Sequence, residues 1–126
     1  MNNNDILAVE TAQKLAQEIQ KALDTKKAEE IAVIPVGDQT SLADFFVIAT
    51  GTSNTHIRAL ADEVEFQTKE TLQTEPAHIE GMGDNAWILM DYSSVIVHIF
   101  TREAREFYKL DKLWDGTPNK ESKDQI

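Results

Sequence analysis

The residues best placed to do chemistry lie where an apolar run ends in a glycine. The run from Asp44 to Thr50 is typical of a buried strand, and Gly51, Thr52 and Ser53 follow it directly. Backbone N–H groups and the dipole of the following helix converge at such a junction, so phosphates often bind there. The sequence has neither the Gly-x-x-x-x-Gly-Lys-Ser/Thr loop nor the Gly-x-Gly-x-x-Gly fingerprint, and nucleotide binding therefore has weak support. A tight turn with an N-capping hydroxyl explains the same residues.

A nucleotidyltransferase would need paired carboxylates as well as this turn. Enzymes that transfer phosphoryl groups with two metal ions hold the ions with neighbouring acidic side chains. The later strands offer Glu80, Asp84 and Asp91, but no Asp-x-Asp or Asp-x-Glu pair. A nucleotidyltransferase-like enzyme that uses the Gly51-Thr52-Ser53 turn and Asp91 is kept as the alternative function. We assign no catalytic residue.

The three histidines do not form a catalytic or metal-binding pattern. His98 lies in an apolar run, where a lone histidine is typical of a hydrogen-bonded core residue, while His56 opens a predicted helix and His78 is near a turn. No two histidines are four residues apart, and the chain has no cysteine, so we expect no metal site and no cofactor. The residue types would allow a Ser-His-Asp catalytic triad of Ser53, His98 and Asp91, but no Gly-x-Ser-x-Gly motif supports it.

The charge of the chain is strongly acidic, with 22 acidic and 12 basic residues and a net charge of −10. Proteins that grip nucleic acid need a basic surface, so we expect no direct nucleic-acid grip and instead a basic protein partner. No apolar run approaches the roughly 20 residues of a membrane span. The first residues lack a signal-peptide pattern. These features favour the cytoplasm and no contact with membranes.

Periodicity predicts an α/β fold with a single mixed sheet of about five strands and packed helices. Apolar residues recur every three to four positions in the predicted helices. The predicted strands are short apolar or β-branched runs, and the run from Asp44 to Thr50 is largely apolar on both faces, as expected for a strand in the centre of a sheet. The short Tyr92-Ser93 connection predicts a hairpin, which makes at least one strand pair antiparallel. Pro35 predicts an edge position or a strand terminus. We expect helices at about 5–26, 53–72 and 101–109, and strands at 31–36, 44–50, 76–80, 86–91 and 94–100.

An aromatic face is the second notable feature. Trp87, Leu89 and Asp91 share one face of a predicted strand, with Tyr92 at the turn that follows it. Tryptophan and tyrosine are enriched at interface hot spots, so this face is a candidate partner surface if helices cover only the other side of the sheet. The other interpretation places Trp87 in the core. A module that pairs with itself, as a homodimer, is a further hypothesis.

Several blocks of residues together resemble the bacterial ribosomal silencing factors, the Iojap-like family. The blocks occur in order over nearly the whole of a single predicted domain, residues 1–115, which a polar tail, 116–126, follows. They are Ser41 to Ile48, Thr50 to Ser53 with His56 and Arg58, Ala61 to Val64, Glu80-Gly81, Trp87 with Asp91-Tyr92, Val97 to Phe100, and Arg105-x-Phe107-Tyr108-x-Leu110 ending in Leu113-Trp114.

The resemblance implies a nucleotidyltransferase-like fold that is not known for catalysis. It implies a repressor that binds the large ribosomal subunit through ribosomal protein L-fourteen at the intersubunit face. Joining of the small subunit is then blocked, which lowers translation when nutrients are scarce. By analogy, the partner surface would comprise Trp87, Asp91 and Tyr92, then Asp44, Thr52, Ser53 and Arg58. The chain departs from the family pattern at Ser93-Ser94, where Gly-Asp is usual, and at Asp111, where glutamate is usual.

Overall fold

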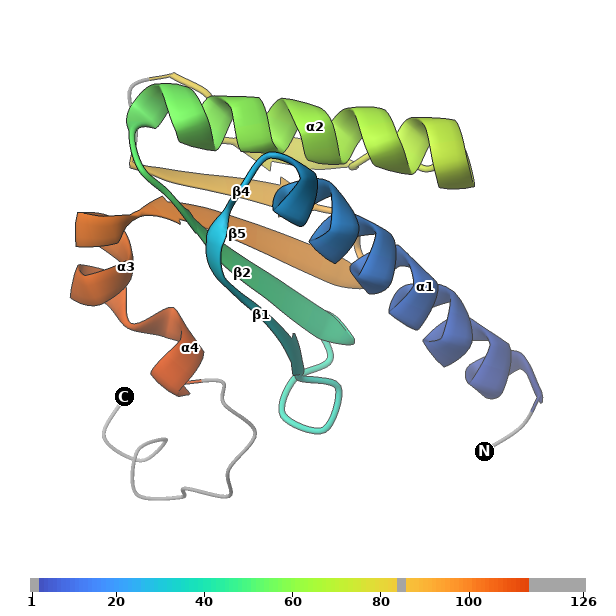
Figure 1. Cartoon of the computed structure of the whole chain (residues 1–126). Helices are drawn as coiled ribbons and strands as arrows, with labels where there is room; N and C mark the ends of the chain where they lie inside the picture. Colours follow the sequence, from blue (N-terminus) through green and yellow to red (C-terminus); the bar gives the residue numbers. More distant parts are fainter. Residues whose placement is uncertain (1–2, 84–85, 114–126) are drawn as a thin grey trace.

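A five-stranded mixed sheet organises residues 3–83 and 86–113, the part of the chain that the computed structural model describes (Figure 1). The strand order is β1-β2-β5-β4-β3; β2 and β5 are parallel, and the other neighbouring pairs are antiparallel. The predicted mixed α/β sheet is therefore confirmed. In chain order the elements are α1 (Asn3–Thr25), β1 (Glu29–Pro35), β2 (Phe45–Gly51), α2 (Asn54–Leu72), β3 (His78–Glu80), β4 (Trp87–Asp91), β5 (Val95–Thr101), α3 (Arg102–Tyr108) and α4 (Leu110–Leu113).

Local signals in the sequence set the ends of these elements. Ser53 caps α2, where its hydroxyl accepts the N–H of His56 at 3.0 Å, and Thr101 caps α3 in the same way. Pro35 is the last residue of the edge strand β1, as predicted. The β4–β5 hairpin is also confirmed. Asp84, the side chain of Asp111, Trp114 and the predicted tail, 116–126, lie outside what the structure describes.

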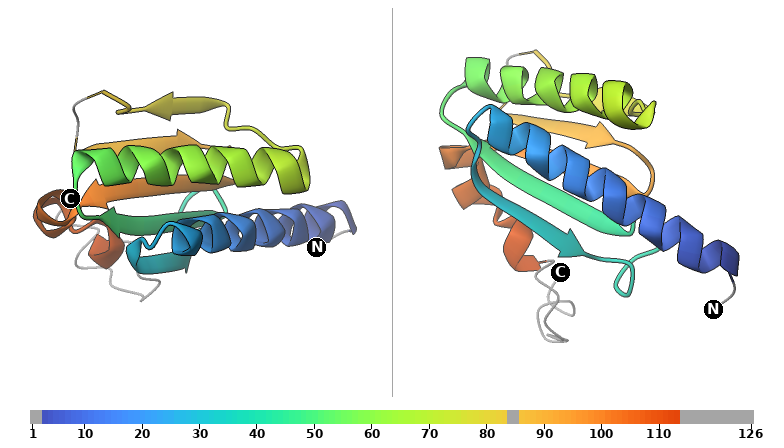
Figure 2. Two further views of the ribbon diagram at one scale, coloured as in Figure 1. Left: turned by 45° about the horizontal axis from the view of Figure 1, so that its top comes forward. Right: turned by 45° about the vertical axis from the view of Figure 1, so that its right-hand side comes forward.

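The two faces of the sheet are covered differently. Helices α1 and α2 lie side by side across one face, and their apolar stripes pack on alternate residues of β2, β4 and β5 (Figures 1 and 2). Helices α3 and α4 lie at the other face and cover only part of it. A smaller core forms there from Ile34, Val36, Ala43, Phe46, Ile48, Phe100 and Ala104.

Strand β2 is an interior strand between β1 and β5, and six of its seven residues are buried. Its carboxyl end lies beside the carboxyl end of β5, because Gly51 pairs with Thr101. Strand β4 runs the opposite way, so that Trp87 is opposite Phe100 at this end and Asp91 is opposite Ile96 at the far end. Among the described residues, no helix has the length and hydropathy required to cross a membrane.

Candidate functional site

The junction between β2 and α2 is closed by packing at Gly51. A Cβ at this position would lie 2.6 Å from Cγ2 of Ile57 and 3.3 Å from its backbone nitrogen. Real Cβ atoms do not approach other carbons so closely, so a side chain here would push the first turn of α2 away from the strand. The glycine is needed for close contact between helix and strand, which accounts for it without a ligand.

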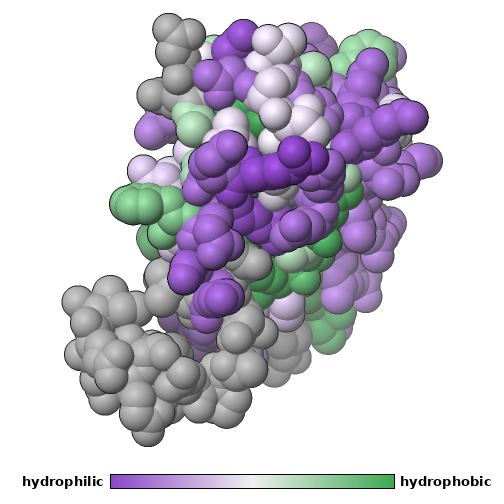
Figure 3. All heavy atoms as spheres, turned by 60° about the vertical axis from the view of Figure 1, so that its left-hand side comes forward, coloured by the Kyte–Doolittle hydropathy of each residue, from purple (hydrophilic) through white to green (hydrophobic). Residues whose placement is uncertain are grey.

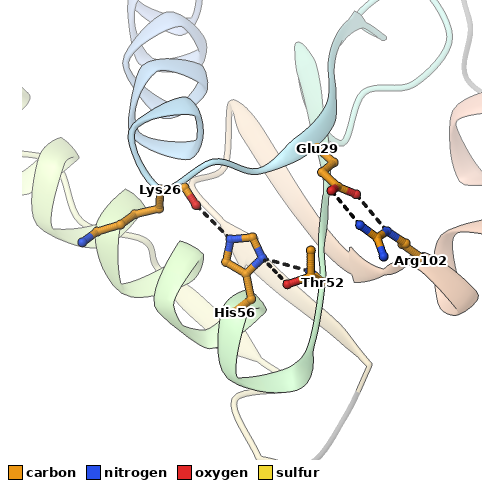
Figure 4. Close-up of polar contacts among 5 residues, drawn as sticks. All are labelled: Lys26, Glu29, Thr52, His56 and Arg102. Atoms are coloured by element: carbon orange, nitrogen blue, oxygen red, sulfur yellow. Dashed lines mark hydrogen bonds and ion pairs between the residues drawn. The ribbon is translucent and has the colours of Figure 1, made fainter.

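The polar groups that follow Gly51 are already used within the protein. The Thr52 N–H donates to Nδ1 of His56 at 2.9 Å, and Nε2 of the same ring lies 2.8 Å from the carbonyl oxygen of Lys26 (Figure 4). Because Nδ1 accepts a backbone hydrogen bond, Nε2 carries the proton and donates it to Lys26. The ring thus ties the end of α1 to the β2–α2 junction and occupies an N–H that a phosphate would need.

The alternative, a nucleotidyltransferase that joins this turn to Asp91, is wrong in its geometry. Gly51 and Asp91 belong to opposite ends of the sheet, because their partners Thr101 and Ile96 are five residues apart on β5. At about 3.3 Å per residue this separation is roughly 16 Å along the strand. The Asp91 carboxylate instead accepts the N–H of Ser93 at 2.7 Å. No group of three or more potential metal ligands occurs among the residues that the structure describes.

Trp87 is half-buried at the end of β4, where it joins an aromatic cluster on the partly covered face. Its ring centroid lies 4.9 Å from that of Phe100 and 4.7 Å from that of Tyr108 in α3. The indole Nε1–H donates to Nδ1 of His98 at 3.1 Å. The ring is therefore held in a fixed orientation, with one part in the core and one part at the surface.

His98 is a hydrogen-bonded core residue, as predicted. It is 4% exposed, and its ring packs against Phe46 and Phe100. Burial lowers the pKa of His98 to about 4, so the imidazole is neutral at physiological pH. Since Nδ1 accepts from Trp87, Nε2 carries the proton, and it is buried without a hydrogen-bond partner among the described residues.

A pocket of about 360 Å³ opens beside Trp87, and we call it the Trp87 pocket. Its lining residues come from β3, β4, the loop between them and α3: Glu80, Gly81, Ala86, Trp87, Leu89 and Tyr108. Tyr108 is 47% exposed and its neighbour Phe107 is 78% exposed. Figure 3 brings the α3 side forward and shows hydrophobic side chains in limited areas among hydrophilic ones. A partner at this surface would meet aromatic rings and carboxylates together.

The loop that forms one wall of the Trp87 pocket depends on a glycine and on a hydrogen bond from α2. Gly81 has a φ of +90°, and a Cβ there would lie 2.2 Å from the carbonyl oxygen of Trp87, so only glycine fits. Arg58 in α2 donates from Nη1 to the carbonyl of Gly83 at 3.0 Å. Arg58, expected as a weaker partner residue, thus lies behind the pocket as a support for its loop.

Two arginines of helix α3 form hydrogen bonds to the strands β1 and β2. Arg102 forms a two-pronged ion pair with Glu29, with N–O distances of 2.9 and 2.7 Å (Figure 4). The hydrogen bond from Arg102 lowers the pKa of Glu29, and the same bond raises the pKa of Arg102. Arg105 donates to the carbonyl of Glu30 and, at 3.0 Å, to the hydroxyl of Thr50. These bonds fix the helix that carries Tyr108 to the Trp87 pocket.

Tyr92 does not share a surface with Trp87. It is 7% exposed and packs in the core beneath α1 and α2, on the opposite face of the sheet. Its hydroxyl lies 2.8 Å from that of Thr68 in α2, and burial raises the pKa of Tyr92 to about 12. The expectation that Tyr92 lies beside Trp87 on one partner surface is therefore wrong.

The remaining predicted residues fall at two ends of the sheet. Thr52 and Ser53 are exposed at the end where Trp87 lies, whereas Asp44 and Asp91 lie at the far end. The structure therefore separates Trp87 from Asp44 and Asp91. Glu80 and Tyr108 were not among the predicted partner residues, although the Arg105-x-Phe107-Tyr108 block could have indicated the second of them.

Comparison with known proteins identifies the family. The family model described as "Ribosomal silencing factor during starvation" matches residues 9–126. The chain belongs to the ribosomal silencing factor family. It is 35% identical to the ribosomal silencing factor of Halalkalibacterium halodurans over 86% of this chain and 92% of that protein, and 32% identical to the one of Bacillus subtilis over 94% and 92%. A crystal structure of a Chromobacterium violaceum protein superposes with a TM-score of 0.79 at 30% identity, covering 85% of this chain and 88% of the other.

Family membership gives the chain a ribosome-associated silencing role, because its relatives are named as ribosomal silencing factors. One residue of the β4–β5 turn has a backbone conformation that is strained for its side chain. Ser93 has a φ of +71° in the β4–β5 turn. Glycine adopts this conformation without strain, whereas a serine Cβ is crowded there. The bond from its N–H to Asp91 helps to hold the turn.

Proposed function

We propose that this silencing factor binds the large ribosomal subunit through a basic protein at the intersubunit face, ribosomal protein L-fourteen. By occupying that face it blocks joining of the small subunit and lowers translation in the cytoplasm under nutrient limitation. The observation that carries this proposal is the Trp87 pocket, an aromatic surface with a carboxylate on an acidic protein. Family membership supports the ribosomal setting.

The chemistry of the Trp87 pocket fits a lysine or arginine side chain of the partner. Trp87 and Tyr108 provide aromatic faces, and a cation over such a face gains about 0.5–2 kcal/mol. Glu80 lines the same pocket and bonds to His78 at 2.7 Å, so its carboxylate is already oriented. Phe107 adds exposed apolar area beside it. Aromatic side chains that become buried in an interface usually dominate its binding energy.

The same geometry supports a regulator and not an enzyme. The β2–α2 junction is the place where a nucleotide would bind in many α/β folds, and there His56 occupies the N–H of Thr52. Asp91, the acid assigned to the alternative enzyme, lies at the other end of the sheet. We infer that this junction is scaffold that orients β2 and α2 behind the pocket.

A capture experiment tests the proposal. The tagged protein is incubated with bacterial lysate, and the captured ribosomal particles are analysed for large and small subunits. We expect large subunits without small ones, and about 30-fold weaker binding for Trp87→Ala or Tyr108→Ala, which corresponds to about 2 kcal/mol. Phe66→Ala is the matched control, because Phe66 is an aromatic residue of α2 that is 58% exposed away from the pocket. Wild-type affinity in both pocket variants would refute the proposed surface.

A further inference from the structure

A second groove, which we call the α1 groove, lies at the far end of the sheet from Trp87. It has a volume of about 500 Å³ and runs between the N-terminal half of α1 and the loop that joins β1 to β2. Val9 of α1, Pro35 at the end of β1 and Phe45 at the start of β2 provide its apolar surface. Asp38 and Asp44 contribute carboxylates to its lining. The silencing role described above does not use this groove.

Apolar side chains around the α1 groove are left without partners in the described part of the chain. The buried stripe of α1 begins only at Ala12, and the helix projects past the ends of the strands (Figures 1 and 2). Ile6 is 42% exposed, and it lies on the same face of α1 as Val9, three residues further on. In the neighbouring loop, Leu42 is 74% exposed. Such exposed apolar groups beside a groove are typical of a binding surface.

The charge of the α1 groove selects among classes of occupant. Neither Asp38 nor Asp44 has a side-chain hydrogen bond or an ion pair among the described residues; Asp44 is held only through its backbone, to Val36 and Ser94. From Ala28 to Ile57 the sequence contains no lysine or arginine. These carboxylates would repel a nucleic acid. They would also repel a second copy of this chain, because the chain has a net charge of −10. Basic groups would be attracted to the two carboxylates.

We propose that the α1 groove docks a basic segment of another protein, which inserts an apolar side chain between α1 and the β1–β2 loop. Lysine or arginine residues that flank this anchor pair with Asp38 and Asp44. This assigns a binding role to Asp44, which lies too far from Trp87 to share its pocket.

The α1 groove and the Trp87 pocket are independent surfaces. Phe45 packs with the core beneath α1 and α2, whereas Trp87 packs in the cluster on the opposite face. Their partners on β5, Val95 and Phe100, are five residues apart, which is about 16 Å along the strand. One copy of the protein can therefore hold a partner in each, and loss of one surface leaves the other intact.

The test uses a synthetic peptide with two leucines flanked by lysines, added to the isotope-labelled Trp87→Ala protein so that the first pocket does not compete. We expect the largest amide shifts in an NMR titration at Val9, Gln13 and Gly37. Affinity should fall about tenfold in Asp38→Lys, which is about 1.4 kcal/mol, and remain unchanged in Asp62→Lys, a charge reversal on the exposed side of α2.

Two control peptides separate this site from general attraction to an acidic protein. Replacement of the leucines by serines should abolish the shifts, and so should replacement of the lysines by glutamates. The proposal fails if the serine peptide binds equally well, if no amide near the groove shifts, or if Asp62→Lys weakens binding as much as Asp38→Lys.

Discussion

The stability of the folded protein should depend on pH, because the aromatic cluster buries His98 in its neutral form. Burial lowers the pKa of His98 from its ordinary 6.5 to about 4. In the unfolded chain the imidazole regains its ordinary pKa, so between about pH 6.5 and pH 4 the unfolded state binds a proton that the folded state excludes. The stability from this group is therefore fully present above about pH 6.5 and is lost as the pH falls through 4.

The size of the effect follows from the two pKa values. A difference from 6.5 to about 4 corresponds to about 3 kcal/mol in full, of which about 2 kcal/mol is lost by pH 5. The assay is urea unfolding at pH 7 and pH 5, followed by circular dichroism. Wild type is compared with His98→Asn, whose amide oxygen can still accept the Trp87 N–H but does not titrate.

We expect the wild type to lose about 2 kcal/mol more than His98→Asn between the two pH values, because the other titrating groups are common to both proteins. An equal loss in the two proteins would show that His98 is not held neutral by burial.

Three further substitutions test the packing. Gly51→Ala should cost about 1–3 kcal/mol, measured as a lower urea midpoint, because its Cβ would meet Ile57 at 2.6 Å; unchanged stability would contradict the scaffold interpretation of the junction. Tyr92→Phe should cost about 1 kcal/mol through the lost bond to Thr68 and leave ribosome binding intact, whereas weaker binding at unchanged stability would return Tyr92 to the partner surface. Ser93→Gly should raise the thermal midpoint by relieving a φ of +71°, a gain of up to about 1 kcal/mol, and a lower midpoint would argue against strain in this turn.

Much of the fold could be predicted because local signals agree with tertiary packing. The apolar stripe of α1, the hydroxyl caps at Ser53 and Thr101, and Pro35 at the end of an edge strand each fix an element from nearby residues. The alternation of side chains along a strand also predicts the face on which Tyr92 lies. Trp87 and Tyr92 are separated by an odd number of positions, so their side chains point to opposite faces of the sheet. Because Tyr92 lies at the turn, just after the end of β4, the sequence alone does not show that the alternation continues to it.

The site could be predicted only in part because it depends on non-local geometry. The contact between Trp87 and Tyr108 requires the β5–α3 connection to return across the open face, and no periodicity indicates that path. The separation of Gly51 from Asp91 depends on strand order and direction, which residue patterns leave open. The residue types of Gly51 and Thr52 are compatible with a phosphate site, yet their geometry is explained by packing against Ile57 and a hydrogen bond to His56.

We propose that binding through the Trp87 pocket is what prevents the ribosomal subunits from joining. The most direct measurement is light scattering from purified large and small subunits mixed with increasing amounts of the protein. We expect wild type and Phe66→Ala to suppress association equally, and Trp87→Ala and Tyr108→Ala to require about 30-fold more protein. Suppression by both pocket variants at the wild-type concentration would contradict the claim.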